Sequence, residues 1–394
     1  MADAAIRTHV APLSAVLRPL EQSIGQTLRQ DIFAERDNPP FDRVCMDGIA
    51  IWSETLNRGV RRFKVQATQS AGTPPVTLAG ADLAVEVMTG AVLPRGTDCV
   101  IPLEEYDLVE GVAMLAEKVS GAPFRNVQRR GEDSELGIPM LTPGIRLGAP
   151  EIAVVASAGL GRVHVSRQPN VAVISTGDEL VEPGEPIAEH QIRRSNAYAV
   201  LAALRMRGFE QARHDHIRDD EALLRERLAQ HLASNDLLVL SGGVSKGKFD
   251  FVPKALTHLG IREIFYKVAQ RPGMPMWFGI GARGQAVFGL PGNPVSTLIC
   301  LVRYVVPALH IAMATRPDPP MRVSLASEFR FERPATCFLP VSVAPDSLGR
   351  PVAIAKSPNG PGDFLSLTES HGFVELPPQS EPFAQGFVAD FHRW

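Results

Sequence analysis

Apolar residues recur at two different spacings along the chain, and the change of spacing divides the chain into segments. Residues 11–29 carry apolar side chains at helical intervals, which predicts an amphipathic helix near the N-terminus. Between residues 38 and 127 the pattern changes to short alternating runs interrupted by Gly and Pro, which predicts an all-β module. A helical pattern over 147–158 and a strand pattern over 159–165 follow. The N-terminal part therefore combines helical segments with one all-β module.

From residue 170 onward, apolar runs of strand length alternate with helical patterns. The runs 171–174, 237–240 and 286–290 are apolar throughout, as in strands that are covered on both faces of a parallel sheet. Ligands bind at the carboxyl ends of the strands in such an α/β domain, so a site is expected in the loops that follow these runs. Helices are predicted over 195–207 (capped by Ser195 or Asn196), 220–233, 251–259 and from residue 295 onward.

The last part of the chain has a different pattern again. A Pro-rich linker, Pro317–Pro320, precedes short β runs at 322–326, 337–343 and 372–376. Such short runs behind a Pro-rich segment predict a small C-terminal β module.

Length, charge and cysteine content restrict the functional class. With 394 residues the chain is too long for one ordinary core, so about two to four domains are expected. The formal net charge is −3 and the isoelectric point is near 6.4, which gives no support to a general nucleic-acid-binding surface. The four cysteines form no C-x-x-C pair, so neither a zinc site nor a disulfide framework is predicted.

No targeting or membrane segment is predicted. The first 20 residues lack the charged and then apolar layout of a signal peptide. The apolar window 295–314 contains Arg303, Pro307 and His310, and is therefore interpreted as a buried helix. We expect a soluble, cytoplasmic protein without a membrane or nucleic-acid partner.

Each of the three apolar runs ends in a polar, Gly-rich loop. The loop Gly289–Ser296 joins a strand to a helix, and its free N–H groups suit an anion such as phosphate. The loop Ser175–Leu180 carries two adjacent acids, Asp178 and Glu179, which suit Mg²⁺. Taken singly, the first loop also fits a plain strand-to-helix turn, and the acids also fit a helix-capping pair.

The third loop, Ser241–Asp250, combines two glycines, two serines and two lysines. Glycine lets the backbone approach a ligand closely, and the hydroxyl and ammonium groups favour an anion. Asp250 fits a metal-binding or basic carboxylate, and equally the N-cap of the helix that follows. A stiff basic loop at Arg271–Pro275, taken alone, is best explained as a β-turn.

In order and spacing, these loops resemble the signature loops of the molybdopterin molybdenumtransferase family, which includes the E domain of gephyrin. The resemblance extends upstream to a Met-Asp-Gly turn within Cys45–Ala50, a Met-Thr-Gly-Ala loop at Met88–Ala91 and an Arg-x-Gly-Glu-Asp segment at Arg129–Asp133. A further acidic motif lies at Arg218–Asp220. The motifs span roughly residues 10–315, and such an ordered set is more specific than any single motif.

The resemblance implies a fold and an activity. Members of this family transfer molybdenum from molybdate to adenylylated molybdopterin, release AMP, use Mg²⁺, and form homodimers whose site is shared between subunits. Their fold combines a helical and extended spine, an inserted β domain, a molybdopterin-binding α/β domain with a parallel sheet, and a C-terminal β-barrel-like domain. On this sequence the parts are, in that order, 1–37 with 135–168, 38–134, 169–316 and 317–394. The molybdopterin adenylyltransferase is a further implied partner.

Carried over onto this sequence, the family motifs imply three groups of site residues. The implied catalytic residues are Asp47, Thr89, Asp133, Glu179 and Asp250, the first three acting on the site of the other subunit. The implied metal ligands are Asp178, Glu179, Asp219 and Asp250. The implied substrate-binding residues are Ser175, Thr176, Gly177, Ser241, Gly242, Gly243, Ser245, Lys246, Arg271, Pro291, Gly292, Asn293, Pro294 and Ser296.

Several positions depart from the family pattern. Met274 stands where the second lysine of the loop is usual, and we expect Lys246 to replace part of this positive charge. Ala335 and Pro361 stand where arginine and serine are usual in the C-terminal module. Two alternatives stay open: a non-catalytic molybdopterin-binding or scaffold protein of the same fold, and a molybdopterin adenylyl-transferring enzyme. The retained acids favour the molybdenumtransferase over the first, and the upstream and C-terminal β modules favour it over the second.

Overall fold

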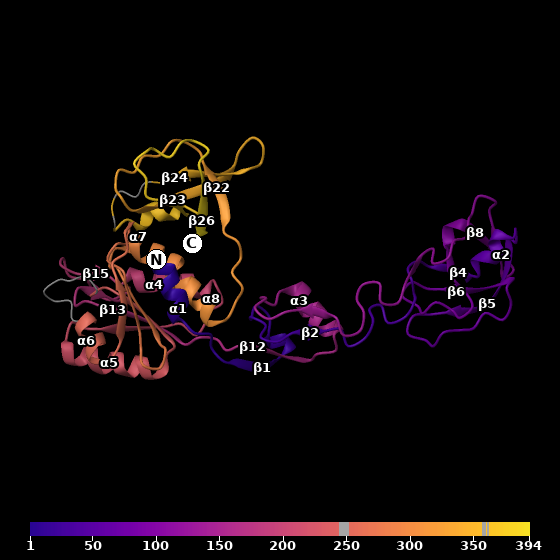
Figure 1. Cartoon of the computed structure of the whole chain (residues 1–394), viewed down its shortest axis with the longest axis horizontal. Coiled ribbons are helices and arrows are strands. Elements are labelled where there is room, and N and C mark those ends of the chain that lie inside the picture. The colour runs from indigo at the N-terminus through magenta and orange to yellow at the C-terminus, as the bar shows by residue number, and fades with distance from the viewer. Residues whose placement is uncertain (244–251, 357–359, 361) are drawn as a thin grey trace.

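The computed structural model describes residues 1–243, 252–356, 360 and 362–394. The chain is elongated (Figure 1), with an inserted sheet at one end of the long axis, a spine in the middle, and a mixed sheet with the C-terminal barrel at the other end. Both termini lie where the mixed sheet and the barrel meet. We define these four parts by their strands, and the domain limits expected from the sequence stay a prediction.

The spine is built from two segments that are far apart in the sequence. β1 (Ala15–Pro19) pairs antiparallel with β12 (Arg162–Ser166), and β2 (Ile32–Phe33) pairs with β11 (Pro139–Leu141). A small apolar core joins these pairs to α3 (Ala149–Ser157). The helix and the strand predicted next to each other in this region are thus confirmed as α3 and β12.

The helix predicted over residues 11–29 is wrong. The N-terminal helix is instead α1 (Ala2–His9), and β1 occupies part of the predicted span. Ile24, one of the apolar side chains that produced the helical pattern, is 64% exposed, so it belongs to no buried helix face. The backbone N–H and C=O groups of β1 form their hydrogen bonds with β12. Because β12 lies more than a hundred residues further along the chain, the local spacing of apolar residues does not reveal this pairing.

The inserted sheet confirms the all-β prediction for this region. Its strand order is β7-β4-β6-β5-β9-β8, in which β5 and β6 are parallel and the other neighbours antiparallel. Apolar cores cover both of its faces, one around Ile49 and the other around Val85. Its elements, with the small pair β3–β10, are β3 (Arg43–Val44), β4 (Gly48–Ile51), α2 (Ser53–Asn57), β5 (Arg62–Gln69), β6 (Leu83–Val87), β7 (Cys99–Pro102), η2 (Leu103–Glu105), β8 (Tyr106–Val109), β9 (Val112–Leu115) and β10 (Val127–Gln128).

The mixed sheet has the strand order β16-β13-β17-β21-β20-β18. Its first four strands are parallel, as the sequence predicts. The last two strands were not predicted, and β20 runs antiparallel to both of its neighbours, β21 and β18. β20 joins β21 through the short turn at 281–285, so it needs no crossover helix. The strands are β13 (Val171–Thr176), β16 (Arg213–Ile217), β17 (Leu237–Ser241), β18 (Arg262–Tyr266), β20 (Trp277–Ile280) and β21 (Ala286–Leu290), and a small pair, β14 (Leu180–Val181) and β15 (Ile192–Arg193), lies beside them.

Helices cover both faces of the mixed sheet and confirm the helices predicted there. One apolar core includes residues of α4, α8 and α1, and the core on the opposite face includes residues of α5 and α6. The expected capping of α4 by Ser195 or Asn196 is wrong, because its N-cap is Arg194 and no side chain caps it. The helical elements are α4 (Ser195–Arg205), α5 (Glu221–Ser234), α6 (Val252–His258), α7 (Pro294–Cys300), the π-helical turn η3 (Leu301–Val305) and α8 (Val306–Ala312).

The continuous run from α7 to α8 is a core helix. Pro294–Ala312 is long and apolar enough to cross a membrane by length and composition alone. However, 72% of its most apolar window is buried inside the protein. The interpretation of this segment as a buried helix therefore holds.

The C-terminal barrel closes on itself, which confirms the predicted barrel-like module. The strands follow the order β23-β24-β22-β26-β25, and β25 pairs back with β23 around an apolar core. The short strand β19 (Gln270–Arg271) adds to β23 and so ties the Arg271 loop to the barrel. The other elements are β22 (Met321–Leu325), β23 (Thr336–Pro345), β24 (Pro351–Ala355), α9 (Phe364–Thr368), β25 (Gly372–Leu376) and β26 (Val388–Arg393).

An ion-pair network joins the barrel to the helices of the mixed sheet. The Arg303 guanidinium donates to both carboxylate oxygens of Asp3 at 2.6 Å and to Oε2 of Glu375 at 2.7 Å. Nε2 of His392 lies 3.2 Å from the same Glu375 oxygen. Burial alone would raise the pKa of Glu375, but the bonds to His392 and Arg303 lower it to about 2.

We expect Glu375→Gln to lower the free energy of unfolding by about 3 kcal/mol at pH 7, because it leaves a buried guanidinium short of one partner. The pKa of Glu375 is lower in the folded chain than the value of about 4.3 in the unfolded chain, so its contribution is fully present above about pH 5 and declines as the pH falls toward 2. Urea unfolding of wild type and variant at pH 7 and pH 3 measures this difference, with the exposed Glu328→Gln as control. A difference that does not shrink at pH 3 would contradict the assignment.

Candidate functional site

Three loops meet at the carboxyl ends of β13, β17 and β21, where the sequence places a site. They border a cavity of about 110 Å³ together with the parallel pair of β14 and β15 and the first turn of α4. The cavity is lined by Ser175, Thr176, Glu179, Leu180, Ile192, Arg193, Arg194, Ser195, Asn196, Ala197, Ser241, Gly242, Gly292 and Pro294. The structure thus gathers at one place residues that are up to 119 positions apart in the chain, from Ser175 to Pro294.

The loops approach one another too closely for a side chain at Gly242. Its φ is +95°, and a Cβ atom there would lie 2.9 Å from the carbonyl oxygen of Thr176. A Cβ atom on Gly292 would lie 3.9 Å from the Cα of Gly242. The absence of side chains at these positions leaves the backbone accessible at the edge of the cavity, as anion-binding loops require.

Asn196 links two of these loops. Its Nδ2 donates to the Gly292 carbonyl at 2.7 Å and to Oγ of Ser241 at 3.2 Å. Its Oδ1 and Oγ1 of Thr176 are buried and have no hydrogen-bond partner in the described part of the chain. Because buried polar atoms are normally paired, these two atoms are available to a ligand.

Ser175 lies between two histidines of β16, His214 and His216. Its Oγ is 3.0 Å from Nε2 of His214 and 3.2 Å from Nδ1 of His216. Burial, followed by the nearby charge of Arg194, lowers the pKa of both imidazoles, so both are neutral at pH 7. Neutral imidazoles can accept from and donate to the Ser175 hydroxyl and so fix its orientation.

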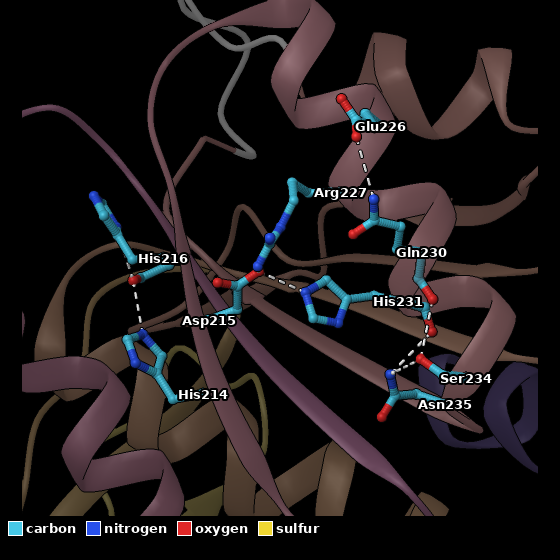
Figure 2. Close-up of polar contacts among 10 residues, drawn as sticks. His214, Asp215, His216, Glu226, Arg227, Gln230, His231, Ser234 and Asn235 are labelled. Atoms are coloured by element: carbon cyan, nitrogen blue, oxygen red, sulfur yellow. Dashed lines mark hydrogen bonds and ion pairs between the residues drawn. The ribbon is translucent and has the colours of Figure 1, made fainter.

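Asp215, between these histidines in sequence, points to the opposite face of β16 (Figure 2). Its Oδ2 accepts from Nη2 of Arg227 and lies at the same 2.7 Å from Nε2 of His231. Burial alone would raise the pKa of Asp215, but the bonds to His231 and Arg227 lower it. This carboxylate therefore holds α5 against the sheet and takes no part in the cavity.

Arg194 brings positive charge to the cavity wall. Its side chain is only 14% exposed and forms an ion pair with Glu182. Its Nε is buried and has no partner in the described part of the chain. Arg194 and the linking role of Asn196 were not predicted from the sequence, although the polar run that starts α4 directly after a strand was a usable signal.

The acids expected to bind metal are only partly gathered. Oδ1 of Asp178 accepts from Nε of Arg218 at 3.2 Å and from the Asp219 N–H at 3.4 Å. Burial, then the charges of Asp178 and Glu179, raise the pKa of Asp219, so these two carboxylates lie within electrostatic reach of Asp219. No group of three or more His, Cys, Asp or Glu side chains arranged to hold a metal occurs among the described residues. Asp250, Ser245 and Lys246 lie outside the described residues.

The loop after β21 begins α7 as the sequence predicts. Asn293 is the N-cap residue and Pro294 the first helical residue, but the Asn293 side chain makes no capping bond. Pro291 accepts at its carbonyl from Oγ1 of Thr297 at 2.6 Å, which fixes the turn. Ser296 lies in the first turn of the helix and is only 3% exposed.

The Arg271 loop packs against the same helix. A Cβ atom on Gly273 would lie 3.7 Å from the Ser296 carbonyl oxygen. The fully buried Gln270 holds this loop, because its Nε2 donates to the carbonyls of Pro272 at 3.3 Å and Gly273 at 3.2 Å. Its Oε1 in turn accepts from the hydroxyl of Tyr304, which lies in the π-helical turn η3.

The remaining predicted catalytic residues lie elsewhere in the chain. Oδ1 of Asp47 accepts from both the N–H and Oγ1 of Thr89 at 2.7 Å, and these bonds lower its pKa. Oδ1 of Asp133 accepts from Nε2 of Gln128 at 2.8 Å. Asp47 and Thr89 flank β4 and β6 of the inserted sheet, at the opposite end of the chain from β13 (Figure 1). Within one chain, the structure does not bring them to the cavity.

Two family descriptions match most of the chain. "MoeA N-terminal region (domain I and II)" matches residues 1–159, and "Probable molybdopterin binding domain" matches residues 172–311. A molybdopterin molybdenumtransferase from Synechocystis sp. is 36% identical over 99% of this chain and 97% of its own length. The chain belongs to the molybdopterin molybdenumtransferase family. It is therefore a member of a family of transferases in molybdenum cofactor biosynthesis.

Other relatives of this chain support its assignment to the molybdenumtransferase family. A molybdopterin molybdenumtransferase from Staphylococcus aureus is 31% identical over 96% of this chain and 91% of its own length. The crystal structure of a molybdopterin biosynthesis MoeA protein from Pyrococcus horikoshii superposes with a TM-score of 0.82 at 29% identity, covering 100% of this chain and 97% of that chain. The similarity therefore includes the inserted sheet and the barrel, and the fold expected from the family resemblance is confirmed.

Proposed function

We propose that this protein transfers molybdenum from molybdate to adenylylated molybdopterin and releases AMP. The observation that carries the proposal is the cavity at the carboxyl ends of β13, β17 and β21, which combines close backbone approach with buried, unpaired polar atoms. Family membership indicates the substrate class, because a relative that aligns over 99% of this chain is a molybdopterin molybdenumtransferase.

The chain's own residues would divide the binding between two neighbouring regions. The hydroxyls of Ser175, Thr176 and Ser241, with the backbone N–H groups of the glycine positions beside them (Gly177, Gly242, Gly243 and Gly292), would bind the phosphate-linked part of the substrate. Arg271 and Ser296, on adjacent elements, would bind the oxyanion. Pro291 and Pro294 would keep the shape of the loop between these regions.

Mg²⁺ fits the acids beside the cavity to the extent that the structure describes them. Mg²⁺ usually takes only one or two protein carboxylates and keeps water and phosphate oxygens as its other ligands. Asp178 and Glu179 lie close enough to Asp219 to raise its pKa, and the three carboxylates would hold the ion with Asp250. When bound, Mg²⁺ would neutralise negative charge at the phosphates of the substrate.

A homodimer would complete the site. Asp47, Thr89 and Asp133 lie on or next to the inserted sheet, remote from their own chain's cavity, and this separation supports a role at the cavity of another copy. We therefore propose a cytoplasmic homodimer in which the inserted sheet of one subunit covers the mixed-sheet cavity of its partner. The adenylylated substrate would come from a molybdopterin adenylyltransferase.

The direct test is a reconstituted reaction. Purified protein is incubated with adenylylated molybdopterin, molybdate and Mg²⁺, and the cofactor formed is measured by activation of an apo-molybdoenzyme while AMP is quantified. We expect molybdate-dependent formation of cofactor and AMP in equal amounts. Tight substrate binding without turnover would indicate the scaffold alternative, and formation of adenylylated molybdopterin from ATP would indicate the adenylyl-transferring alternative.

The Tyr304→Phe variant tests the oxyanion role of the Arg271 loop. Loss of the hydroxyl leaves Oε1 of the buried Gln270 unpaired, so the loop that carries Arg271 is less well fixed. We expect the apparent KM for molybdate to rise about three- to tenfold with kcat nearly unchanged, a loss of about 0.7–1.4 kcal/mol in binding. Tyr106→Phe in the inserted sheet serves as control, and an equal rise in KM for both variants would contradict the assignment.

A further inference from the structure

A second, larger cavity lies between the spine, the mixed sheet and the linker that leads to the barrel. Its volume is about 720 Å³, which is in the range of small-molecule sites. Its walls come from 22–27 and 144–146 of the spine, from 207–211 after α4, and from 310–318 at the end of α8. It shares no lining residue with the cavity at Ser175.

Four arginines line this second cavity, and none of them pairs with a carboxylate within the ranges that the structure describes. Nε of Arg146 donates to the Gly25 carbonyl at 2.9 Å, and Nη2 of Arg316 donates to Oγ1 of Thr142 at 2.6 Å. Arg207 is held by two backbone carbonyls, those of Ala203 at 2.9 Å and Arg393 at 2.8 Å. The fourth arginine, Arg18, is exposed at the cavity. Each of the three fixed guanidinium groups keeps N–H donors that these contacts do not use.

Positive charge exceeds negative charge in this cavity. Among the residues that the structure describes, two acids line it, Glu210 and Asp318, against the four arginines. The positive charge of the arginines affects His310, which also lines the cavity. Burial lowers the pKa of His310 most, the charges of Arg146 and Arg207 lower it further, and the charge of Asp318 acts in the opposite direction. Uncompensated guanidinium groups around a concave surface favour an anion, and phosphate oxygens match their paired N–H donors.

One wall of the cavity also carries an unused hydrogen-bond acceptor. Nε2 of Gln168 donates to Oε1 of Gln26 at 2.8 Å, which fixes the amide. Oε1 of Gln168 is buried and has no partner in the described chain. A phosphate ion, which offers few donors, would leave this acceptor unpaired, whereas an N–H group on an organic ligand would satisfy it.

We propose that this cavity binds a phosphorylated small molecule of nucleotide size, with its phosphate on the arginines and an N–H group of its organic part on Gln168. The volume, the charge excess and the unpaired amide oxygen all point to such a ligand. The site differs from the proposed molybdopterin site in its residues, so its occupancy does not depend on the proposed reaction. The ligand therefore needs both a negatively charged phosphate for the arginines and an N–H donor for Oε1 of Gln168.

The test is a calorimetric titration of the full-length protein with AMP and, separately, with inorganic phosphate. We expect AMP to bind at least about tenfold more tightly than phosphate, because only AMP offers N–H donors. Arg146→Gln and Arg18→Gln should each weaken AMP binding about ten- to hundredfold, the effect of losing one charge-assisted contact. Arg225→Gln, which removes an exposed arginine of α5 outside the cavity, is the matched control and should change nothing.

The outcomes separate the competing explanations. AMP is also the product of the proposed reaction, so the titration is read for two sites, and loss of one AMP site in the cavity variants while that site persists in Gly242→Ala, which alters the mixed-sheet cavity, supports the proposal. Loss in Gly242→Ala alone places the nucleotide at the mixed-sheet cavity and overturns it. Equal affinities for AMP and phosphate overturn the role of Gln168. If Arg146→Gln and Arg18→Gln instead shift the subunit equilibrium and leave AMP binding intact, the cavity is covered by a second copy and the proposal is wrong.

Discussion

The Gly242→Ala protein should fold and lose molybdenum transfer by at least about a hundredfold, which corresponds to about 2.7 kcal/mol of transition-state stabilisation. A Cβ atom at this position would lie 2.9 Å from the Thr176 carbonyl oxygen, so the loops after β13 and β17 must move apart. That movement changes the cavity where backbone N–H groups and hydroxyls meet the substrate. Positioning errors of this kind have large effects on rate because the bound geometry is itself part of catalysis.

Gly260→Ala is the matched control for backbone strain. Gly260 also has a positive φ, +78°, but a Cβ atom there would meet nothing within 4 Å. Gly260→Ala should therefore lose about 1–2 kcal/mol of stability from the left-handed backbone conformation, Gly242→Ala should lose at least as much, and only Gly242→Ala should lose activity. Thermal unfolding and the cofactor-forming assay measure the two effects separately. Activity of Gly242→Ala within threefold of Gly260→Ala would show that close approach of the loops is not required.

The sequence was sufficient for the part of the site that depends on local pattern. Ser175, Ser241 and Gly292 each follow a continuous apolar run, and the carboxyl ends of parallel strands lie at one edge of a sheet. Their convergence could therefore be expected before the strand order was known. Closure of the barrel could not be derived in this way, because it depends on the pairing of β23 with β25, and β24 and β26 carry patterns too irregular to be recognised.

The sequence was insufficient where a contact depends on register between distant strands. His216 lies opposite Ser175 only because β16 pairs with β13, and the sequence of β16 gives no sign of which strand it will join. Asn196 appeared as a cap because amides are common there, but with α4 packed over β13 its side chain binds Ser241 and Gly292 instead. Tertiary contacts of this kind override local preference.

Mixed dimers of two inactive chains should recover activity, and this is the second large effect that the structure predicts. Asp47→Asn removes the charge that Thr89 binds in the inserted sheet, and Gly242→Ala alters the mixed-sheet cavity, so each homodimer should lose activity by at least about a hundredfold. In a mixed dimer, the intact inserted sheet of one chain meets the intact cavity of the other. One of its two sites is then complete.

Complementation therefore tests the central claim, a site shared by two subunits, most directly. After equal amounts of the two variants are mixed and random subunit exchange is confirmed by mass spectrometry, half of the dimers should be mixed and each should hold one working site. We expect the recovered rate of molybdenum transfer to be about a quarter of the wild-type rate. A rate that stays at the level of the separate variants, despite confirmed mixed dimers, would contradict the claim and place the whole site within one chain.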